Sequence, residues 1–309
     1  MTPEQTLHRL GGVATRKDLT AFTHLDLAAA IASGSIVRTA KGRYALPTAE
    51  VARVAGHRLS AVVGLRSAAA SWGWALKTQP ERPEIIVPRG RKVSVDDQAE
   101  FDVRWRRLSS SDVDGWRTTP ARTVIDCATT LPFDEALAVA DSALRSETVT
   151  RAELFRVAEA LPGRGRDAAL DVVWHASELP AGPFESIIRA VAIGVPGLRL
   201  EPQVRITVAG RTIRSDLVDR ELRLVVEADS HEFHTTRDRI DSDCWRYDEL
   251  ALDDWFVVRI SWVQAMYRQE WVRSVLSRAT VRQWPLLPTT VARARGGHPD
   301  GSVRAASPA

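Results

Sequence analysis

Carboxylates interrupt two apolar segments of this chain, Arg214-Ser-Asp-Leu-Val218 and Leu222-Arg-Leu-Val-Val-Glu-Ala-Asp229, and His231 and His234 follow them. The apolar residues indicate buried strands, yet each strand carries an acid, Asp216 or Glu227. An acid is expensive to bury unless it is paired or binds a metal ion. Because side chains alternate between the two faces of a strand, Glu227 and Asp229 point the same way. The pattern therefore predicts either a cation site built from oxygen ligands or a polar layer of ion pairs.

The residues around these strands predict an α+β domain over residues 179–285. Val204, Ile206 and Val208 alternate with polar residues before a turn at Ala209-Gly210, which is typical of a hairpin. The expected elements are a helix over residues 183–193, a strand over 204–208, a strand containing Asp216, a strand ending at Glu227, a helix over 237–252, a strand over 256–260 and a helix from about residue 264.

Residues 1–48 are expected to form a winged helix-turn-helix unit. Two capping boxes, Thr15-Arg-Lys-Asp18 and Thr23-His-Leu-Asp26, each predict a helix start, and the short gap between them is typical of a helix-turn-helix. A basic hairpin over residues 36–46 would form the wing. The candidate DNA contacts, mostly to phosphate, are Arg16, Lys17, His24, Arg38, Lys41 and Arg43.

A second interpretation makes this N-terminal unit a protein-docking or dimerisation module. Its second predicted helix carries Ala28-Ala-Ala-Ile31, which is a bare face for reading bases. Both interpretations remain open from the residues alone.

The remaining residues divide into a middle domain and a tail. Residues 49–178 predict a mixed α/β domain, with strands near residues 84–88 and 101–105 and mostly helices from Pro120 onward. Residues 286–309 are rich in Pro, Gly, Ala and Arg, and we expect this tail to be disordered.

The bulk composition indicates an ordinary globular protein of 309 residues, 44% hydrophobic and 26% charged. A net charge of +3 is compatible with nucleic acid but does not require it. Cys127 and Cys244 are far apart and fit neither a disulfide framework nor a zinc-binding spacing. No targeting segment and no apolar run of about 18 residues occurs, so we expect a cytoplasmic protein that does not contact membranes.

Several spaced motifs resemble known families. The C-terminal domain resembles the very-short-patch-repair-like family of the PD-(D/E)XK nuclease superfamily, and the residues that carry this resemblance are Phe184-Glu185, Pro202-Gln203, Arg214-x-Asp216, Glu227-x-Asp229, His234, Asp243-x-x-Arg246 and Trp255-Phe-Val-Val-Arg259. The N-terminal unit is similar to the winged helix of AbiEi-type antitoxins through Gly11-Gly-Val-Ala-Thr15 and Gly42-Arg-Tyr-Ala-Leu-Pro47. Thr119-Pro-Ala-Arg-Thr-Val-Ile-Asp126 resembles the middle region that joins these two parts in many actinobacterial proteins.

The nuclease resemblance implies a restriction-endonuclease-like fold of order αβββαβα with a divalent-metal site. Asp216, Glu227 and Asp229 would be the ligands of Mg²⁺ or Mn²⁺, since hard cations prefer oxygen. Asp229 stands where the superfamily often carries lysine. His234, and with less support His231, would transfer a proton. Glu185 on the preceding helix would help hold a water or the ion.

Three functions follow from these alternatives. The first is a metal-dependent DNA endonuclease that is targeted by its own winged helix, in a defence or toxin–antitoxin setting. The second is a non-catalytic DNA-binding regulator or antitoxin with a degenerate nuclease fold, in which Arg214, Arg223 or Arg246 pairs with the acids. The third is a scaffold that binds only proteins. The expected partners are DNA and a cognate toxin or a second copy of the chain.

Overall fold

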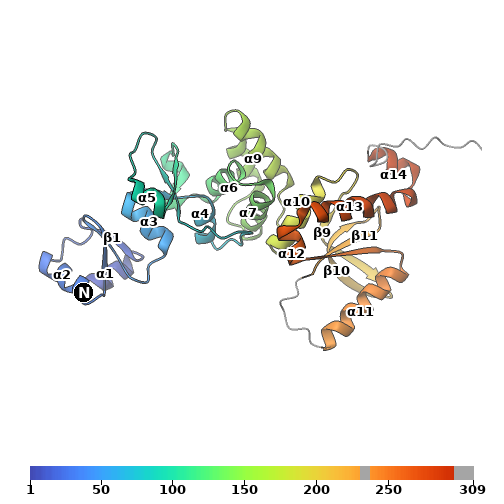
Figure 1. The fold of residues 1–309 in the computed structure, drawn as a ribbon, viewed down its shortest axis with the longest axis horizontal. Coiled ribbons are helices and arrows are strands. Elements are labelled where there is room, and N and C mark those ends of the chain that lie inside the picture. Colours follow the sequence, from blue (N-terminus) through green and yellow to red (C-terminus); the bar gives the residue numbers. More distant parts are fainter. Residues whose placement is uncertain (230–236, 296–309) are drawn as a thin grey trace, which may run out of the picture. The chain divides into compact units, whose positions relative to one another are not determined.

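The structure, a computed structural model, describes residues 1–229 and 237–295, and the chain divides into two compact units (Figure 1). The first unit contains residues 1–130 and 149–170. The second contains residues 131–148 and the chain from Asp171 onward. Each unit is described by itself below.

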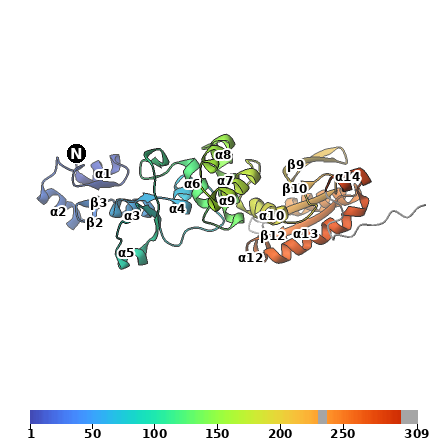
Figure 2. The same cartoon turned by 90° about the horizontal axis from the view of Figure 1, so that it is seen from above.

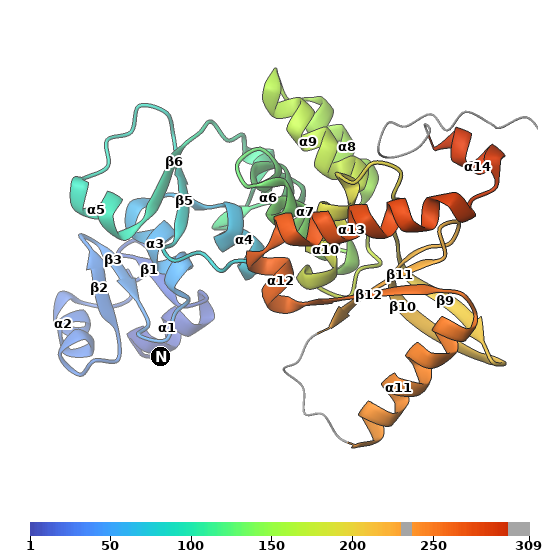
Figure 3. The same ribbon diagram turned by 45° about the vertical axis from the view of Figure 1, so that its right-hand side comes forward.

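The first unit begins with a winged helix (Figure 3). Its elements are α1 (Pro3–Arg9), β1 (Val13–Thr15), α2 (His24–Ala32), β2 (Val37–Ala40) and β3 (Arg43–Ala45). The strands form an antiparallel sheet in the order β1-β3-β2, and the β2–β3 hairpin is the predicted wing. Leu7, Leu19, Leu27, Ile36 and Tyr44 make its small buried core.

The helix predicted to begin at Thr15 is wrong, because residues 16–22 form turns. The capping contacts exist, since Asp18 accepts hydrogen bonds from the Thr15 amide at 2.8 Å and from the Thr15 hydroxyl at 2.6 Å. No helix follows them because β1 ends at Thr15 and a second capping box starts α2 at Thr23, leaving too few residues to nucleate a helix.

The rest of the first unit is built around a mixed five-stranded sheet of order β6-β5-β4-β8-β7. Its strands are β4 (Val62–Val63), β5 (Glu84–Val87), β6 (Asp102–Trp105), β7 (Val113–Asp114) and β8 (Arg117–Thr118). Its helices are α3 (Val51–Leu59), α4 (Leu65–Ser71), α5 (Val95–Glu100), the 3₁₀ turn η1 (Ser110–Asp112), α6 (Pro120–Ala128) and α8 (Arg151–Glu159), and α9 (Arg164–His175) runs on into the second unit. Helix α8 packs against α6 (Figure 2). The two strands expected near residues 84–88 and 101–105 are confirmed as β5 and β6.

The second unit contains a four-stranded sheet of order β12-β11-β10-β9. The elements are α7 (Phe133–Arg145), α10 (Pro183–Ile193), β9 (Glu201–Val208), β10 (Arg211–Asp219), β11 (Leu224–Asp229), α11 (Arg237–Leu252), β12 (Phe256–Ser261), α12 (Trp262–Tyr267) and α13 (Gln269–Gln283). From α10 onward this is the predicted order of helix, three strands, helix, strand and helix. Strand β10 is antiparallel to both β9 and β11, and β12 is parallel to β11.

The two faces of this sheet are covered by different helices. Leu217, Val226 and Ile260 pack with α10, α12 and α13 in the larger core. Val204, Val218, Val225 and neighbouring residues form a smaller core with Trp245, Tyr247 and Leu250 of α11. Figure 1 shows α11 lying beside β10. The α11 face therefore receives the side chains of alternate strand residues.

Part of the segment predicted as a disordered tail has regular structure. After the short 3₁₀ turn η2 (Trp284–Leu286), residues Thr289–Ala294 form α14. Arg295 then donates hydrogen bonds to both carboxylate oxygens of Asp219, at 2.7 and 2.8 Å, and to the Gly197 carbonyl oxygen at 2.7 Å. Residues 296–309 lie outside the described part. In the described ranges, no helix has the length and apolar character needed to span a membrane.

Candidate functional site

The second unit brings Asp216 and Glu227 together on neighbouring strands. Strand β10 pairs with β11 through Leu217 and Val226, which point into the larger core, so the residues beside them point to the opposite face, under α11. The Asp216 amide lies 3.5 Å from Glu227 Oε2. Two of the predicted site residues are therefore direct neighbours.

Glu227 forms an ion pair with Arg246 of α11. Its side chain is nearly buried, with 5% of its surface exposed, and Oε1 accepts a hydrogen bond of 2.5 Å from Arg246 Nη2. The same nitrogen also donates to the Arg214 carbonyl oxygen at 2.9 Å and approaches the Ser215 hydroxyl at 3.3 Å. The contact agrees with the alternative in which an arginine neutralises the buried acid.

Asp216 is held by neutral groups. Its Oδ2 accepts a hydrogen bond of 2.9 Å from the Ala228 amide, and Oδ1 lies 3.4 Å from Gln203 Nε2. Gln203 also donates to Glu185 Oε2 at 2.8 Å, and that oxygen accepts a second hydrogen bond of 2.9 Å from the Ala181 amide. Among the side chains that the structure describes, no basic group forms an ion pair with Asp216. Gln203 thus links Glu185 to Asp216.

Burial changes the protonation of this cluster. Burial raises the pKa of Glu227 to about 7, the nearby Arg246 guanidinium opposes this rise, and the nearby Asp216 carboxylate adds to it. Burial also raises the pKa of Glu185, against the hydrogen bonds from Ala181 and Gln203. A raised carboxyl pKa in the neutral range is typical both of active sites and of buried structural acids.

Asp229 is drawn away from the other two acids. It forms an ion pair with Arg259 of β12, whose guanidinium lies 4.7 Å from the centre of the Tyr247 ring. Strand β12 is parallel to β11 and places Arg259 directly beside Glu227, so its side chain reaches diagonally to Asp229. This contact could not be predicted from the sequence, because it depends on strand register. Asp229 consequently has its charge neutralised within the fold.

The arrangement does not supply a complete metal site. Among the residues that the structure describes, no group of three or more His, Cys, Asp and Glu side chains is placed to hold an ion. Glu227 and Asp229 each hold a guanidinium where an ion would need their oxygens. The predicted His234 and His231 lie outside the described residues. The described side chains therefore do not fit Mg²⁺ or Mn²⁺ as they stand.

The predicted DNA contacts of the winged helix differ in how far they are exposed. Lys17, His24, Arg38 and Lys41 are exposed. Arg16 instead donates to the carbonyl oxygens of Leu19 and Phe22, at 2.7 and 3.0 Å, and ties down the turns before α2. Arg43 donates to the His57 carbonyl oxygen at 2.5 Å and to the Ser60 hydroxyl, which connects the wing to α3. Lys17, His24 and Lys41 can therefore meet a phosphate without breaking an internal contact among the described residues, whereas Arg38 Nε lies 3.4 Å from the Ala40 carbonyl oxygen.

Helix α2, which the sequence analysis predicted to contact DNA, has a largely apolar outer face. Leu25 is 81% exposed and Ile31 is 37% exposed, whereas only Leu27 of this helix is buried. Asp26 caps the helix through hydrogen bonds from the Thr23 amide and hydroxyl, at 2.7 and 2.8 Å. The polar groups that α2 itself offers to a DNA groove are few, so phosphate contacts from Lys17 and the wing carry more of any binding.

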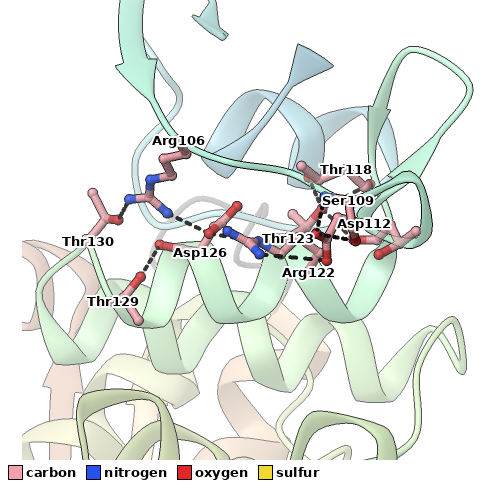
Figure 4. A network of polar contacts seen from close by, with 10 residues as sticks. Arg106, Ser109, Asp112, Thr118, Arg122, Thr123, Asp126, Thr129 and Thr130 are labelled. Atoms are coloured by element: carbon pink, nitrogen blue, oxygen red, sulfur yellow. Dashed lines mark hydrogen bonds and ion pairs between the residues drawn. The ribbon is translucent and has the colours of Figure 1, made fainter. Parts of the chain in front are cut away.

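A network of polar residues in the first unit explains the motif Thr119-Pro-Ala-Arg-Thr-Val-Ile-Asp126 (Figure 4). Asp126 receives Arg106 Nη1 at 2.5 Å and lies 3.0 Å from Arg122 Nε, and Arg106 Nη2 also donates to the Thr130 hydroxyl at 2.6 Å. Thr123 shares a hydrogen bond of 2.6 Å with Thr118. The motif thus fastens α6 to β8 and to the segment after β6, and each of its charged residues has a structural partner.

Comparisons with known proteins were made for the whole chain. No match was found among curated proteins. A crystal structure of the RV2827C protein from Mycobacterium tuberculosis aligns with 60% of this chain and 78% of its own chain, at 16% sequence identity and a TM-score of 0.36. Residues 60–172 match the family model of the AbiEi antitoxin C-terminal domain, so this part of the chain is similar to that antitoxin domain.

Proposed function

We propose that this protein is a DNA-binding regulator of the antitoxin type, with a nuclease-like C-terminal domain that does not cleave. The observation that carries the proposal is the match of residues 60–172 to an antitoxin domain, directly after a winged helix. A toxin protein would then be the second partner. Co-expression with the product of a neighbouring gene, scored by rescue of growth, tests that partner, and toxicity unchanged by the protein contradicts it.

The winged helix supports the DNA-binding half. Lys17 and Lys41 are exposed on the turns before α2 and at the tip of the wing, where cations meet the phosphate backbone in proteins of this fold. Such contacts supply affinity without sequence information. Any sequence preference would have to come from the few polar groups of α2 and from the shape of the DNA.

The acid cluster supports the non-catalytic half. Glu227 is paired with Arg246, which is one of the pairings that the polar-layer alternative named, and Asp229 is paired with Arg259, which that alternative did not name. A buried, hydrogen-bonded ion pair fixes packing and is hard to open, because separating it leaves a desolvated charge. In this proposal, the Glu227–Arg246 pair holds α11 to the sheet, and the Asp229–Arg259 pair joins β11 to β12.

A gel shift with a pool of random-sequence DNA duplexes tests the proposed DNA contact. The double variant Lys17→Glu/Lys41→Glu should weaken binding by at least roughly tenfold, since each reversal replaces attraction to phosphate by repulsion. Arg164→Glu/Arg166→Glu is the control, because it makes the same change of charge on the exposed start of α9, outside the winged helix. Equal weakening by both variants would show only a general charge effect and would contradict the proposal.

A metal-dependent endonuclease is the second candidate, and one observation favours it. Asp216 and Glu227 are neighbours on adjacent strands, Glu185 is linked to them through Gln203, and Asp216 has no ion-pair partner among the described residues. The test is cleavage of plasmid and single-stranded DNA with Mg²⁺ or Mn²⁺, compared with Asp216→Asn/Glu227→Gln. Metal-dependent cleavage that the double variant abolishes would replace the regulator proposal with this one. Cleavage that persists in the variant points to a contaminant.

A further inference from the structure

A hollow in the first unit is lined by residues that belong neither to the winged helix nor to the acid cluster. Its volume is about 700 Å³, and it opens beside the ends of β5 and β6. Apolar side chains that include Val62, Ile86 and Leu108 line one part, and Arg89, Arg106 and Arg107 line another. Neither the antitoxin match nor the proposed DNA contacts assigns a role to it. The volume falls in the range of sites that take small molecules.

The polar side of this hollow is strongly cationic. None of the residues that line it is acidic. Arg106 is fixed in place by Asp126 and Thr130 (Figure 4), whereas Arg89 and Arg107 are exposed and have no acid partner among the described residues. Arg91 adds a further cation nearby, since its Nη1 lies 3.3 Å from the carbonyl oxygen of Ser60 on the rim. Three guanidinium groups around one hollow favour an anion that can accept several hydrogen bonds.

The apolar side is a preformed wall. Ile86 is only 2% exposed and belongs to β5, the second strand of the five-stranded sheet. Arg106 follows β6, and its amide donates a hydrogen bond of 3.0 Å to the Val87 carbonyl oxygen, which fixes the cationic side against this strand. A wall of this kind suits a flat or apolar body, because burying that body removes its surface from water without reorganising the protein.

We propose that this hollow binds a phosphorylated small molecule whose body is flat and largely apolar, such as a nucleotide. The phosphate would lie against Arg89 and Arg107, with Arg106 at the back, and the body would lie against Ile86, Val62 and Leu108. The site shares no lining residue with the winged helix, although Ser60 on its rim accepts a hydrogen bond from Arg43 of the wing.

Calorimetric titration of the full chain tests this site with three probes: adenosine monophosphate, inorganic phosphate and a short single-stranded oligonucleotide. Adenosine monophosphate should bind saturably with a Kd below about 1 mM. Arg89→Ser and Arg107→Ser should each weaken it by roughly tenfold, as expected for the loss of a charge-assisted hydrogen bond. Lys92→Ser is the matched control, since it removes the same charge from an exposed residue close in sequence that does not line the hollow.

Leu108→Ser tests the apolar side of the hollow separately from the cationic side. It should weaken adenosine monophosphate and leave inorganic phosphate unchanged, because only the nucleotide has a body to lose contact. The proposal is overturned if no saturable binding of adenosine monophosphate occurs, or if Lys92→Ser weakens it as much as Arg107→Ser. It is also overturned if the oligonucleotide alone binds, since the cations would then serve a polymer backbone and the hollow would be incidental.

Discussion

The protonation of Glu227 depends on neighbours with opposite effects on its pKa. It lies in the middle of a buried strand, and α11 supplies Arg246 to neutralise it, yet Asp216 stands beside it with a second negative charge. Burial and the neighbouring acid favour the protonated carboxyl, and the arginine favours the ionised one. The raised pKa of about 7 means that burial outweighs the arginine.

Folding stability should therefore depend on Glu227 between weakly acidic and weakly basic pH. The carboxyl pKa rises from 4.5 to about 7 on folding, so the folded state binds the extra proton in this interval. Its contribution is fully present below pH 4.5 and is lost as the pH rises through 7, a change on the order of 3 kcal/mol. Glu227→Gln cannot titrate, so its free energy of unfolding relative to wild type should increase with pH.

Urea denaturation of both proteins from about pH 5 to pH 8 measures this difference. A difference that stays constant over the whole range would mean that Arg246 keeps Glu227 ionised throughout, contrary to the prediction.

Asp141 is a second buried acid and is more completely paired. Its Oδ2 lies 2.6 Å from Arg189 Nη1, Oδ1 accepts a hydrogen bond of 2.7 Å from the Ser177 amide, and the side chain has no exposed surface. Asp141→Asn leaves Arg189 as a buried, unpaired cation and should lower the free energy of unfolding by about 3 to 5 kcal/mol. Asp171→Asn is the control, because its pair with His175 is 3.7 Å long and exposed. That control should change stability by less than about 1 kcal/mol in the same denaturation experiment.

Helix starts provide a prediction for single elements. Thr150 caps α8 with a complete capping box, in which the Glu153 amide donates to the Thr150 hydroxyl at 3.2 Å and the Thr150 amide donates to Glu153 at 3.1 Å. Thr119 occupies the same position of α6 but makes no side-chain capping bond. Thr150→Ala should therefore destabilise the first unit by about 1 kcal/mol, and Thr119→Ala by clearly less. Thermal unfolding of the two variants compares them directly, and equal losses would contradict the role of the cap.

Elements with complete local signals were predictable from the sequence. Helices α10 and α11 and strand β12 lie where apolar periodicity and turn residues indicated them. The prediction of a helix after Thr15 was wrong, because the Thr15–Asp18 hydrogen bonds occur in a turn as well as at a helix start. Helix α14 was not predicted. The contact that follows it, from Arg295 to Asp219, joins residues far apart in the sequence and leaves no periodic pattern.

The candidate site was predictable only in part. The proximity of Asp216 and Glu227 could be predicted, because they lie on two strands that follow each other in the sequence. Gln203 and Glu185 lie in motifs that carried the family resemblance. The partner of Asp229 was not predictable, because Arg259 reaches it only through the parallel register of two strands separated by a helix. The nuclease-like classification and the role of His234 stay predictions.

For the whole molecule, the proposed DNA binding should show the salt dependence of phosphate contacts. Lys17→Ser/Lys41→Ser removes two cations without adding repulsion, and the slope of log K against log salt concentration should decrease in magnitude by roughly 1.8. Fluorescence anisotropy with a duplex at several salt concentrations measures the slope. An unchanged slope would mean that the duplex contacts another surface. The antitoxin match adjoins the winged helix in sequence and accords with this arrangement.

Helix α7 belongs to the second unit, although the segments before and after it in the sequence belong to the first. The chain passes from the first unit to the second after Thr130, returns after Thr148 and leaves again after Leu170. A break after Thr130 separates residues 149–170 from the rest of the first unit, a break after Leu170 separates α7 from the rest of the second, and a break after Thr148 does both. For the same reason, residues 171–309 expressed alone would lack α7 and would leave uncovered the face of α10 against which α7 packs. Each unit can therefore be isolated complete only together with chain that belongs to the other.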